Sequence, residues 1–395
     1  MNKKETVINT ARELFTKYGY KKVSMDEIAK EANVTKKTIY SYFKDKDSMF
    51  SYFIREELEK MKKRIEKKEA LTEDSVFRLA SMTKPITAVA VLIQAERGKL
   101  SADMPVSKII PGFAHMNVAE QDGGYKIKEE AKKQITVEDL LSHKSGLGCM
   151  EAGEYQLGKM TLSDKKSLKT VVNFYENMAL DFQPGEMERY SPVAAFDVLA
   201  RLVELTSDME FAEFTKKYIF DPMEMPDTTF TPNDNQWKRV VDMHNFKDGK
   251  SINTHMQKGI IFTDFPPSYT CGGAGCVSTL NDYSKFAEML LNEGTYAGKR
   301  IVSEEAVKQM QIPRLPVAAD TRWETWGLGV RVNKNGFYKE IPEGAYGWSG
   351  AYGTHFWVDP LNKITAVYMK NSLYDGGSGA QTARHFEYDV DNALK

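Results

Sequence analysis

The sequence changes character at about residue 70, and this change constrains the fold more than any other feature. Residues 1–70 carry 18 Lys and Arg against 12 Asp and Glu, a balance of +6, whereas the rest carry 36 against 43, a balance of −7. A length of 395 residues by itself suggests two or three domains. The sequence therefore predicts a basic head on a larger acidic body, with nucleic acid as the partner to expect at the head.

The head predicts short helices joined by tight turns. Ser24 and Glu27 form a capping-box pattern, and Thr35 can cap the helix that follows a turn at Asn33. The apolar spacing before them marks one helix face. Three helices with a tight turn before the third fit a helix-turn-helix. The expected helices span 3–18, 24–31, 35–43 and, as a longer charged helix, about 46–68.

The segment VSMDEIAKEANVTKKTIYSYFKDKDSMF (23–50) resembles the DNA-binding domain of the TetR family of repressors. In a helix-turn-helix the first residues of the third helix reach base edges in the major groove. These residues would be Thr35, Lys36, Lys37, Thr38, Tyr40 and Ser41. The resemblance implies further contacts to bases or phosphates from Tyr40, Tyr42 and Lys46.

A small helical bundle with a solvated basic face is the alternative interpretation of the head. TetR proteins continue into a large helical ligand-binding and dimerisation domain, whereas here the chain changes character first. Operators of this kind are usually read by dimers, so the head is expected to bind DNA only weakly on its own. The oligomeric state stays open.

The pattern Ser-x-x-Lys, which places both side chains on one helical face, occurs three times. The serines are Ser41, Ser163 and Ser81, and only Ser81 opens a long apolar helix, over about 82–97. A lysine one turn away, here Lys84, can help to deprotonate the serine. An ordinary helix N-cap is the alternative role for Ser81.

Several further segments, in order along the chain, resemble β-lactamase-related serine hydrolases, the group of class C β-lactamases, D-alanyl-D-alanine peptidases and family VIII esterases. SVFRLASMTKP resembles the nucleophile segment, and VEDLLSHKSGL a second signature loop. QPGEMERYSPVAAFDVLARLVE resembles the segment that carries a catalytic tyrosine, and GWSGAYGTHFWVDP resembles the strand that closes the active site. The resemblance runs from about 71 to 370.

The resemblance implies roles for individual residues. Ser81 would attack an acyl carbon, and Tyr190 with Lys84 would share its proton and return it to the leaving group. The backbone N–H groups of Ser81 and Ala351 would form the oxyanion hole. Whether Lys84 or Tyr190 is the base is not decided by the sequence, and a packed core tyrosine is the alternative for Tyr190.

Two departures from the penicillin-recognising members concern the substrate. Tyr190-Ser191-Pro192 stands where those members have Tyr-x-Asn, and proline has no side-chain amide. Trp348, Ser349 and Gly350 stand where they have Lys-Thr-Gly, so the cation that would pair a substrate carboxylate is gone. These three residues are expected to bind substrate, unless Trp348 is plain core. Both changes favour small neutral acyl esters, with amides or β-lactams as alternatives.

The predicted fold is α+β: a β-lactamase/transpeptidase-like antiparallel sheet flanked by helices, preceded by an all-α head. Family members place two strands before the nucleophile segment, and no two strand-like runs lie between Met1 and Ala70, so the sheet is expected to lack these strands. The edge left exposed would be covered by the long helix of the head or by another chain, or the domain would be compromised. The expected domains are the head (1–50), a connecting charged helix (51–70) and the hydrolase domain (71–395).

The six histidines show no metal-ligand spacing and no phosphate-binding glycine loop is present, so neither a metal nor a cofactor is expected. No signal peptide or membrane-spanning run is recognisable, which favours a cytoplasmic protein without membrane contact.

Three hypotheses for the function follow: an acyl-ester hydrolase with a DNA-binding head, a regulator that uses its hydrolase-like domain as a sensor, and an inactive fusion. The joint presence of Ser81, Lys84 and Tyr190 favours the first.

Overall fold

The computed structural model divides the chain into two compact units, Met1–Thr72 and Glu73–Lys395. No helix in the part that it describes is both long and apolar enough to cross a membrane. The described residues are 3–18, 23–49, 51–52, 71–121, 126–161, 163–247, 250–253, 269–314, 324–334, 341–372 and 381–394.

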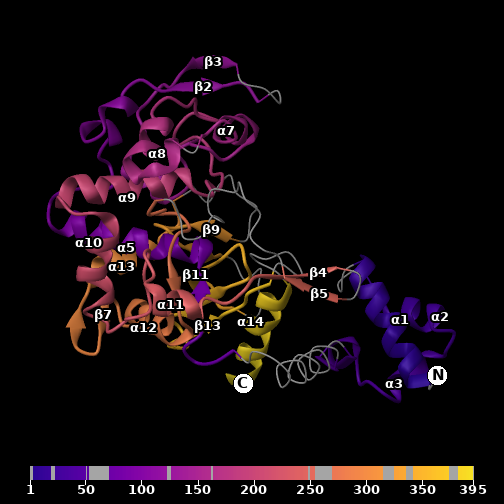
Figure 1. The fold of residues 1–395 in the computed structure, drawn as a ribbon. Helices are drawn as coiled ribbons and strands as arrows, with labels where there is room; N and C mark the ends of the chain where they lie inside the picture. Colours follow the sequence, from indigo (N-terminus) through magenta and orange to yellow (C-terminus); the bar gives the residue numbers. More distant parts are fainter. Residues whose placement is uncertain are drawn as a thin grey trace. The chain divides into compact units, whose positions relative to one another are not determined.

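The first unit contains α1 (Lys3–Tyr18), α2 (Met25–Glu31) and α3 (Lys36–Tyr40), as Figure 1 shows. The capping box is confirmed, because the Ser24 side chain accepts from Glu27 N–H while the Glu27 carboxylate accepts from Ser24 N–H. Thr35 caps α3 by accepting from Thr38 N–H. The turn between these helices has Asn33 at a φ of +50°.

Helix α3 ends at Tyr40, before the expected end at 43. The Ser41 hydroxyl donates to the Thr38 carbonyl at 2.7 Å, and the chain turns at 41–42. Such side-chain bonds to the backbone compete with helix continuation. Helix resumes at 46–49 and 51–52, while the rest of the charged helix expected to reach 68 lies outside the described residues.

An apolar core of its own holds the first unit together. It combines the inner face of α1 with residues of α2, α3 and the turns beside them. Its buried members are Val7, Ile8, Ala11, Phe15, Val23, Ile28, Ala29, Ala32, Ile39, Phe43 and Met49.

The second unit mixes helices with short strands. Its longer helices are α5 (Thr83–Glu96), α6 (Val137–Leu141), α7 (Glu151–Leu157), α8 (Leu168–Tyr175), α9 (Ala194–Ser207), α10 (Phe211–Thr215), α11 (Asp234–Arg239), α12 (Leu280–Leu291), α13 (Glu304–Gln311) and α14 (Gln381–Leu394). Short 3-10 turns are η2 (Ala80–Met82), η3 (Val106–Lys108), η4 (Pro111–Phe113) and η5 (Asp164–Lys166), and η6 (Lys216–Phe220) is a π-helical turn.

The strands are grouped into one five-stranded sheet and four two-stranded ones. The larger sheet has the order β13-β12-β11-β10-β9 and the small pairs are β1-β6, β2-β3, β4-β5 and β7-β8. The bounds are β1 (Phe77–Arg78), β2 (Asn117–Ala119), β3 (Ile127–Glu130), β4 (His244–Lys247), β5 (Lys250–Asn253), β6 (Val277–Ser278), β7 (Thr295–Tyr296), β8 (Lys299–Arg300), β9 (Glu324–Trp326), β10 (Arg331–Asn333), β11 (Tyr346–Ser349), β12 (His355–Asp359) and β13 (Ile364–Tyr368).

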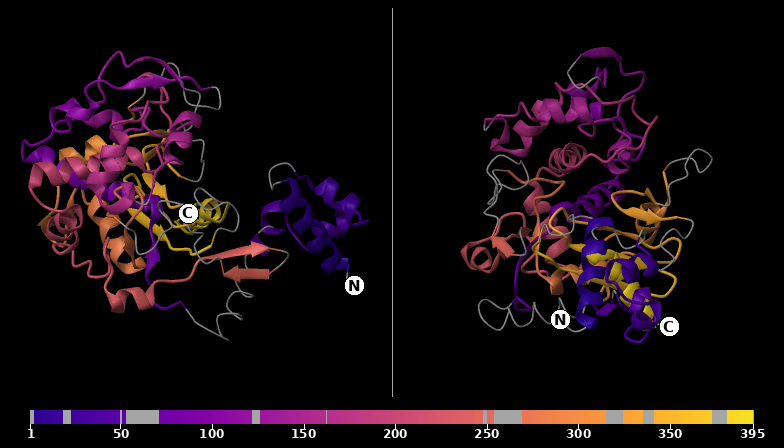
Figure 2. Two further views of the ribbon diagram at one scale, coloured as in Figure 1. Left: turned by 45° about the horizontal axis from the view of Figure 1, so that its top comes forward. Right: turned by 90° about the vertical axis from the view of Figure 1, so that its right-hand side faces the viewer.

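Helices cover both faces of the five-stranded sheet, which is antiparallel throughout. Successive side chains of β12 point to opposite faces. Accordingly Phe356 packs on Tyr283 of α12, while Trp357 packs on Phe386 of α14. The sheet strands and α14 carry the orange and yellow colours of Figures 1 and 2. The prediction of an antiparallel sheet flanked by helices is confirmed.

One predicted strand is wrong in extent. The run WGLGVRV (326–332) forms the end of β9, a turn and the start of β10, because Gly327 N–H donates to the Val330 carbonyl and Gly329 has a φ of +73°. Such a positive φ suits glycine and interrupts an extended strand. The predicted strands at 353–359 and 364–371 correspond to β12 and β13.

The sheet begins late in the chain, as expected. The described residues before β1 contain no strand, and β13 pairs with β12 on one side without a second strand partner among the described strands.

Helix α5 packs on α9 and is buried along nearly all its length. The apolar run that predicted a buried helix therefore marks the central helix of the hydrolase-like unit.

Candidate active site

Ser81 lies in the 3-10 turn η2, between β1 and the first residue of α5. Leu79 N–H donates to the Cys276 carbonyl, which anchors the chain just before this turn on β6. Ala80 has a φ of +46°, a left-handed conformation that is uncommon for alanine. Such strained residues gather at functional sites, and this one sets the direction of the half-buried Ser81 side chain.

Lys84, one helical turn after Ser81, is fully buried. Its Nζ lies 3.3 Å from Ser81 Oγ, 2.6 Å from the Pro192 carbonyl and 2.9 Å from the Gly273 carbonyl. A lysine ammonium has three N–H donors, and each has an acceptor here. The two carbonyls make it possible to hold a protonated Lys84 beside the serine without a carboxylate.

Tyr190 approaches Ser81 from the segment before α9. Its hydroxyl lies 2.6 Å from Ser81 Oγ, closer than Lys84 Nζ. The next residue, Ser191, donates to the Leu147 carbonyl and accepts from Ala195 N–H, which ties this segment to the start of α9. The structure thus brings together the three residues that the sequence predicted to be catalytic.

Asp197 on α9 supports the loop that supplies one of the Lys84 acceptors. Its carboxylate accepts from the hydroxyls of Tyr175 and Tyr269, at 3.0 and 2.8 Å, and from Gly272 N–H at 2.8 Å. Burial raises the pKa of Asp197 to about 6, although these hydrogen bonds act in the opposite direction. This support was not predicted, since nothing in the sequence links Asp197 to the glycine-rich turn that contains Gly273.

The segment that follows β11 lies against the turn that holds Ser81. A Cβ on Gly350 would lie 2.3 Å from the Leu79 carbonyl oxygen, so only glycine fits there. Thr354 Oγ1 also donates to that carbonyl, at 3.2 Å, and Ala351 packs against the small cluster of Ala80, Met243 and Tyr352. This arrangement carries Ala351 to the turn that holds Ser81, as an oxyanion hole built from both N–H groups requires. Their joint action on an oxyanion stays a prediction.

Trp348 projects from β11 toward Tyr190. Its ring centroid lies 5.3 Å from that of Tyr190 and 4.1 Å from that of Trp326. Tyr190 and Trp326 are stacked at 5.6 Å with an interplanar angle of 17°. Trp348, which corresponds in sequence to the lysine of Lys-Thr-Gly, therefore forms an aromatic wall with Trp326 beside Tyr190.

Ser349 points to the opposite face of the sheet and is 3% exposed. Its hydroxyl lies 2.7 Å from Nδ1 of His355, whose Nε2 lies 2.7 Å from Glu387 of α14. Burial lowers the pKa of His355, whereas the pKa of Glu387 falls to about 2 because His355, Arg331 and Arg384 outweigh burial. The Ser349 side chain therefore links β11 to α14 through His355, and only the Ser349 backbone is left for substrate binding.

Two aromatic residues at the site were missed by sequence reasoning. Trp326 closes the stack on Tyr190, and the ring centroid of His143 lies 4.2 Å from that of Trp326 and 4.8 Å from that of Tyr190. His143 lies inside the signature segment VEDLLSHKSGL, which was the available signal. The described residues include no group of three or more His, Cys, Asp or Glu placed to hold a metal ion.

The residues predicted to read DNA lie on and just after α3. Tyr40 and Tyr42 are 49% and 36% exposed. Lys36 pairs with Asp26 at 2.6 Å, and Lys46 Nζ donates to the Val23 carbonyl at 3.1 Å. The exposed or half-exposed members of the set are Thr35, Lys36, Lys37, Thr38, Tyr40, Ser41, Tyr42 and Lys46.

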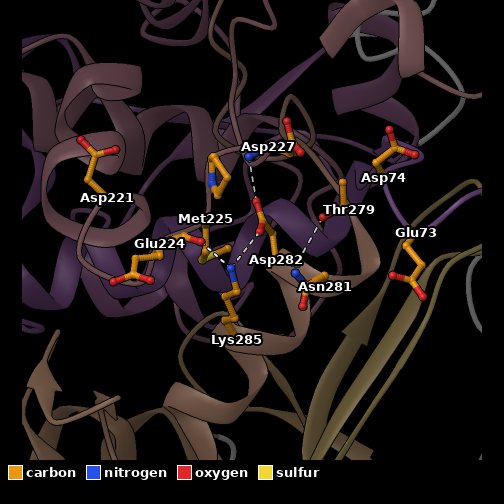
Figure 3. A pocket seen from close by; sticks show the side chains of 11 residues that line it. Glu73, Asp74, Asp221, Glu224, Met225, Asp227, Thr279, Asn281, Asp282 and Lys285 are labelled. Carbon is orange, nitrogen blue, oxygen red and sulfur yellow. Dashed lines mark hydrogen bonds and ion pairs between the residues drawn. The ribbon is translucent and has the colours of Figure 1, made fainter. Parts of the chain in front are cut away.

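A surface cleft of about 610 Å³ lies elsewhere in the second unit (Figure 3). Its lining is acidic, but Asp282 bonds to Asp227 N–H and to Lys285, and Asp227 pairs with Arg239. These contacts join the start of α12 to the segment before α11, as a structural role requires. The predicted catalytic residues are absent from its lining, so the cleft does not compete with Ser81 as an active site.

Comparison with known proteins identifies both units. Residues 48–387, most of the chain, match the family model described as Beta-lactamase. The chain belongs to the β-lactamase family. This membership makes it a serine hydrolase and confirms the predicted fold of the second unit. Residues 7–53 match the model for bacterial regulatory proteins of the tetR family, so the first unit carries a TetR-type helix-turn-helix domain.

Individual relatives of this β-lactamase-family protein include esterases and a penicillin-binding protein. Esterase EstB of Burkholderia gladioli is 28% identical over 340 residues, covering 79% of this chain and 81% of that protein. Penicillin-binding protein 4 of Amycolatopsis lactamdurans is 27% identical over 310 residues, covering 76% and 74%. The solved structure of EstCE1, a hydrolase with promiscuous acyltransferase activity, has a TM-score of 0.67 at 22% identity and covers 83% of this chain and 87% of that chain.

Proposed function

We propose that this serine hydrolase cleaves small neutral acyl esters through an acyl-enzyme on Ser81. The observation that carries the proposal is the double contact at Ser81 Oγ, with the Tyr190 hydroxyl at 2.6 Å and Lys84 Nζ at 3.3 Å. A serine needs a neighbouring base and a stabilised alkoxide to act as a nucleophile near neutral pH. The Tyr190 hydroxyl and the Lys84 amino group are placed to meet these two requirements.

Tyr190 is the better candidate for the base. Lys84 Nζ commits hydrogens to the Pro192 and Gly273 carbonyls, at 2.6 and 2.9 Å, whereas the Tyr190 hydroxyl lies closer to Ser81 Oγ than Lys84 Nζ does, at 2.6 against 3.3 Å. In this proposal Tyr190 acts as the phenolate, and the Lys84 charge, 4.9 Å from the Tyr190 ring centroid, stabilises negative charge on the oxygens of Tyr190 and Ser81. As Ser81 Oγ bonds to the acyl carbon, its proton passes to the Tyr190 oxygen, and the same proton then leaves with the alcohol.

Deacylation repeats these steps with water in place of the alcohol. Water attacks the acyl carbon and gives a proton to Tyr190, the bond from carbon to Ser81 Oγ breaks, and Ser81 regains the proton. The N–H groups of Ser81 and Ala351 would bind the oxyanion in both tetrahedral intermediates. Neither step requires a metal or an organic cofactor.

The preference for a neutral ester rests on Trp348 and Pro192. The Trp348 ring lies beside Tyr190 where a cation would pair a substrate carboxylate, and Pro192 uses its carbonyl to hold Lys84. An apolar wall binds an acyl chain better than an anion, because a charge loses its hydration there without a partner. The likeness to EstB, named an esterase, supports the same choice.

The test is the hydrolysis of p-nitrophenyl butyrate by the full chain and by its Ser81→Ala variant. We expect a Ser81-dependent rate, with the variant slower by at least about 10³-fold. Ser163→Ala is a matched control, since Ser163 heads another Ser-x-x-Lys pattern on an exposed turn. Equal rates for wild type and Ser81→Ala would exclude the proposal and favour the sensor or the inactive fusion.

A second function, binding of DNA by the TetR-type head, is favoured by the exposed side chains of α3. DNA is then a partner of this chain beside its ester substrate, and the proposal implies a cytoplasmic location. A gel shift with genomic fragments at low and moderate salt tests it, because phosphate contacts weaken as salt rises. The absence of a retarded band even at low salt would exclude it.

A further inference from the structure

His143 has an unusual position beside the catalytic tyrosine. Its φ of +57° lies in the left-handed region, which is uncommon for residues other than glycine. It is completely buried, and burial together with the charge of Lys84 lowers its pKa well below the ordinary value. A strained, buried, neutral histidine next to an active site calls for a functional explanation.

The contacts of His143 bracket Tyr190 along the backbone. The His143 carbonyl accepts from Arg189 N–H at 2.9 Å, and its Nδ1 accepts from Ser191 N–H at 3.0 Å. One residue therefore holds the N–H groups of Arg189 and Ser191, the two residues that flank Tyr190. Its ring also lies against the Tyr190 ring at 4.8 Å and against Trp326 at 4.2 Å.

A direct catalytic role for this imidazole does not fit the geometry. Because Nδ1 accepts a hydrogen bond, the neutral ring carries its proton on Nε2 and keeps no free lone pair for a proton from Ser81. Nε2 is buried and has no hydrogen-bond partner among the described residues. Such an unsatisfied N–H costs free energy, so the ring is retained for what Nδ1 and the aromatic face do.

We propose that His143 is a positioning residue, which fixes Tyr190 at hydrogen-bond distance from Ser81 by clamping the backbone of residues 189–191. The inference rests on the proposed function, since it concerns how Tyr190 is placed for that reaction. The clamp works through the acceptor at Nδ1 and through the left-handed backbone that aims it. A shift of Tyr190 by about 1 Å costs on the order of 10²-fold in rate when geometry controls a reaction.

The substitutions His143→Asn and His143→Leu separate the acceptor from the bulk of the side chain. Asparagine tolerates a positive φ, and its Oδ1 can take the place of Nδ1 as acceptor from Ser191 N–H. Leucine fills space but accepts nothing. We expect His143→Leu to lose roughly 10- to 100-fold in kcat/KM for p-nitrophenyl butyrate, and His143→Asn to retain most of the activity. Equal losses in both variants would overturn the clamp.

A double-mutant cycle with Tyr190→Phe gives a readout that a merely structural role would not move. If His143 acts through Tyr190, His143→Leu adds little further loss once the tyrosine hydroxyl is gone. Full additivity of the two losses contradicts the inference. The exposed His115 provides the control His115→Asn, which should leave the rate unchanged.

Thermal melting accompanies each assay, and His143→Gln replaces His143→Leu if the latter does not fold. Glutamine carries its oxygen one bond farther from the backbone, so the kcat/KM of His143→Gln should lie between those of His143→Asn and His143→Leu.

Labelling of Ser81 by a fluorophosphonate supplies the rate where turnover is too slow to follow. Loss of labelling only in Ser81→Ala, with additive His143 and Tyr190 effects, rejects the clamp and keeps the proposed function. A wild type without Ser81-dependent labelling or hydrolysis rejects both.

Discussion

The surface of α3 and the Ser81 site are built in opposite ways. On α3 the contacts are local. The Thr35 side chain accepts a hydrogen bond from Thr38 N–H, and the Ser41 hydroxyl donates to the Thr38 carbonyl. At the other site Ser81 meets Tyr190 from 109 residues away, and Lys84 meets the Gly273 carbonyl from 189 residues away. A solvated helix surface depends on its own residues, whereas a buried polar site depends on the whole fold. Substitutions should therefore have small, separable effects on α3 and large effects at Ser81.

Removing the Lys84 ammonium should have the largest effect. Lys84→Met keeps much of the side-chain volume but leaves the Pro192 and Gly273 carbonyls without a donor. We expect kcat/KM for p-nitrophenyl butyrate to fall by about 10²- to 10⁴-fold. Lys166→Met, in the exposed Ser-x-x-Lys pattern, is the control. A change of less than twofold in Lys84→Met would remove the contrast between the two regions.

Breaking the buried ion network between β12 and α14 should come next. Glu387→Gln leaves the guanidinium groups of Arg331 and Arg384 without their carboxylate. Loss of one partner from a buried pair costs about 3 kcal/mol or more in the free energy of unfolding. Urea unfolding of the full chain measures this loss, with Glu305→Gln on the exposed face of α13 as the control. Similar midpoints for both variants would mean that the network does not support the sheet.

Restoring a cation at the aromatic wall should change specificity rather than rate. Trp348→Lys places an ammonium on the β11 face that Tyr190 occupies. The kcat/KM ratio of p-nitrophenyl hydrogen succinate to p-nitrophenyl butyrate should rise about tenfold, which corresponds to roughly 1.4 kcal/mol. Trp237→Lys, at a tryptophan that is 37% exposed and lies on α11, should leave the ratio unchanged. An unchanged ratio in Trp348→Lys would show that Trp348 does not line the substrate-binding site.

Acidification should reveal the contribution of Asp197 to stability. Its buried carboxylate supports the glycine-rich turn that contains Gly273. The pKa of Asp197 is raised to about 6, so the folded state takes up its proton between pH 7.5 and 5.5 while the unfolded state does not. Stability from this group is present at low pH and is lost as pH rises through about 6. His143 and His355, whose pKa values are lowered by burial, act in the opposite sense, because the unfolded state binds their protons first.

The substitution Asp197→Asn isolates this contribution. Without Asp197, acidification from pH 7.5 to 5.5 should lower the free energy of unfolding by about 1 kcal/mol more than it does in wild type. Urea unfolding at the two pH values measures the difference. A loss that is equal or smaller in the variant would show that Asp197 is already ionised in the folded protein near pH 6.

On α3 the effects should be smallest. Lys37→Ala should weaken DNA binding only a few-fold and reduce the slope of log affinity against log salt by about 1. Lys36→Ala should do less, since the ammonium of Lys36 is already paired with Asp26. Gel shifts at several salt concentrations compare the two, with Lys166→Ala as a control in the other unit. A collapse of binding in Lys36→Ala alone would reverse this order.

Much of the local structure was predictable because it depends on neighbouring residues. The capping box of Ser24 and Glu27, the apolar run of α5 and the strands β12 and β13, which are rich in β-branched and aromatic residues, each depend on residues within a few positions of each other. The exception at WGLGVRV has a local cause too, since Gly329 makes a turn where aromatic and β-branched residues predicted a strand.

The sequence by itself determined the family, the order of its motifs and the identities of Ser81, Lys84 and Tyr190, whose catalytic roles stay predictions. Only the tertiary structure decided which groups support them. Asp197 holds the loop of Gly273, and His143 brackets Tyr190, because chain segments far apart in sequence meet there. These contacts join buried polar groups, and a buried polar group can be satisfied only by the partner that the fold places beside it.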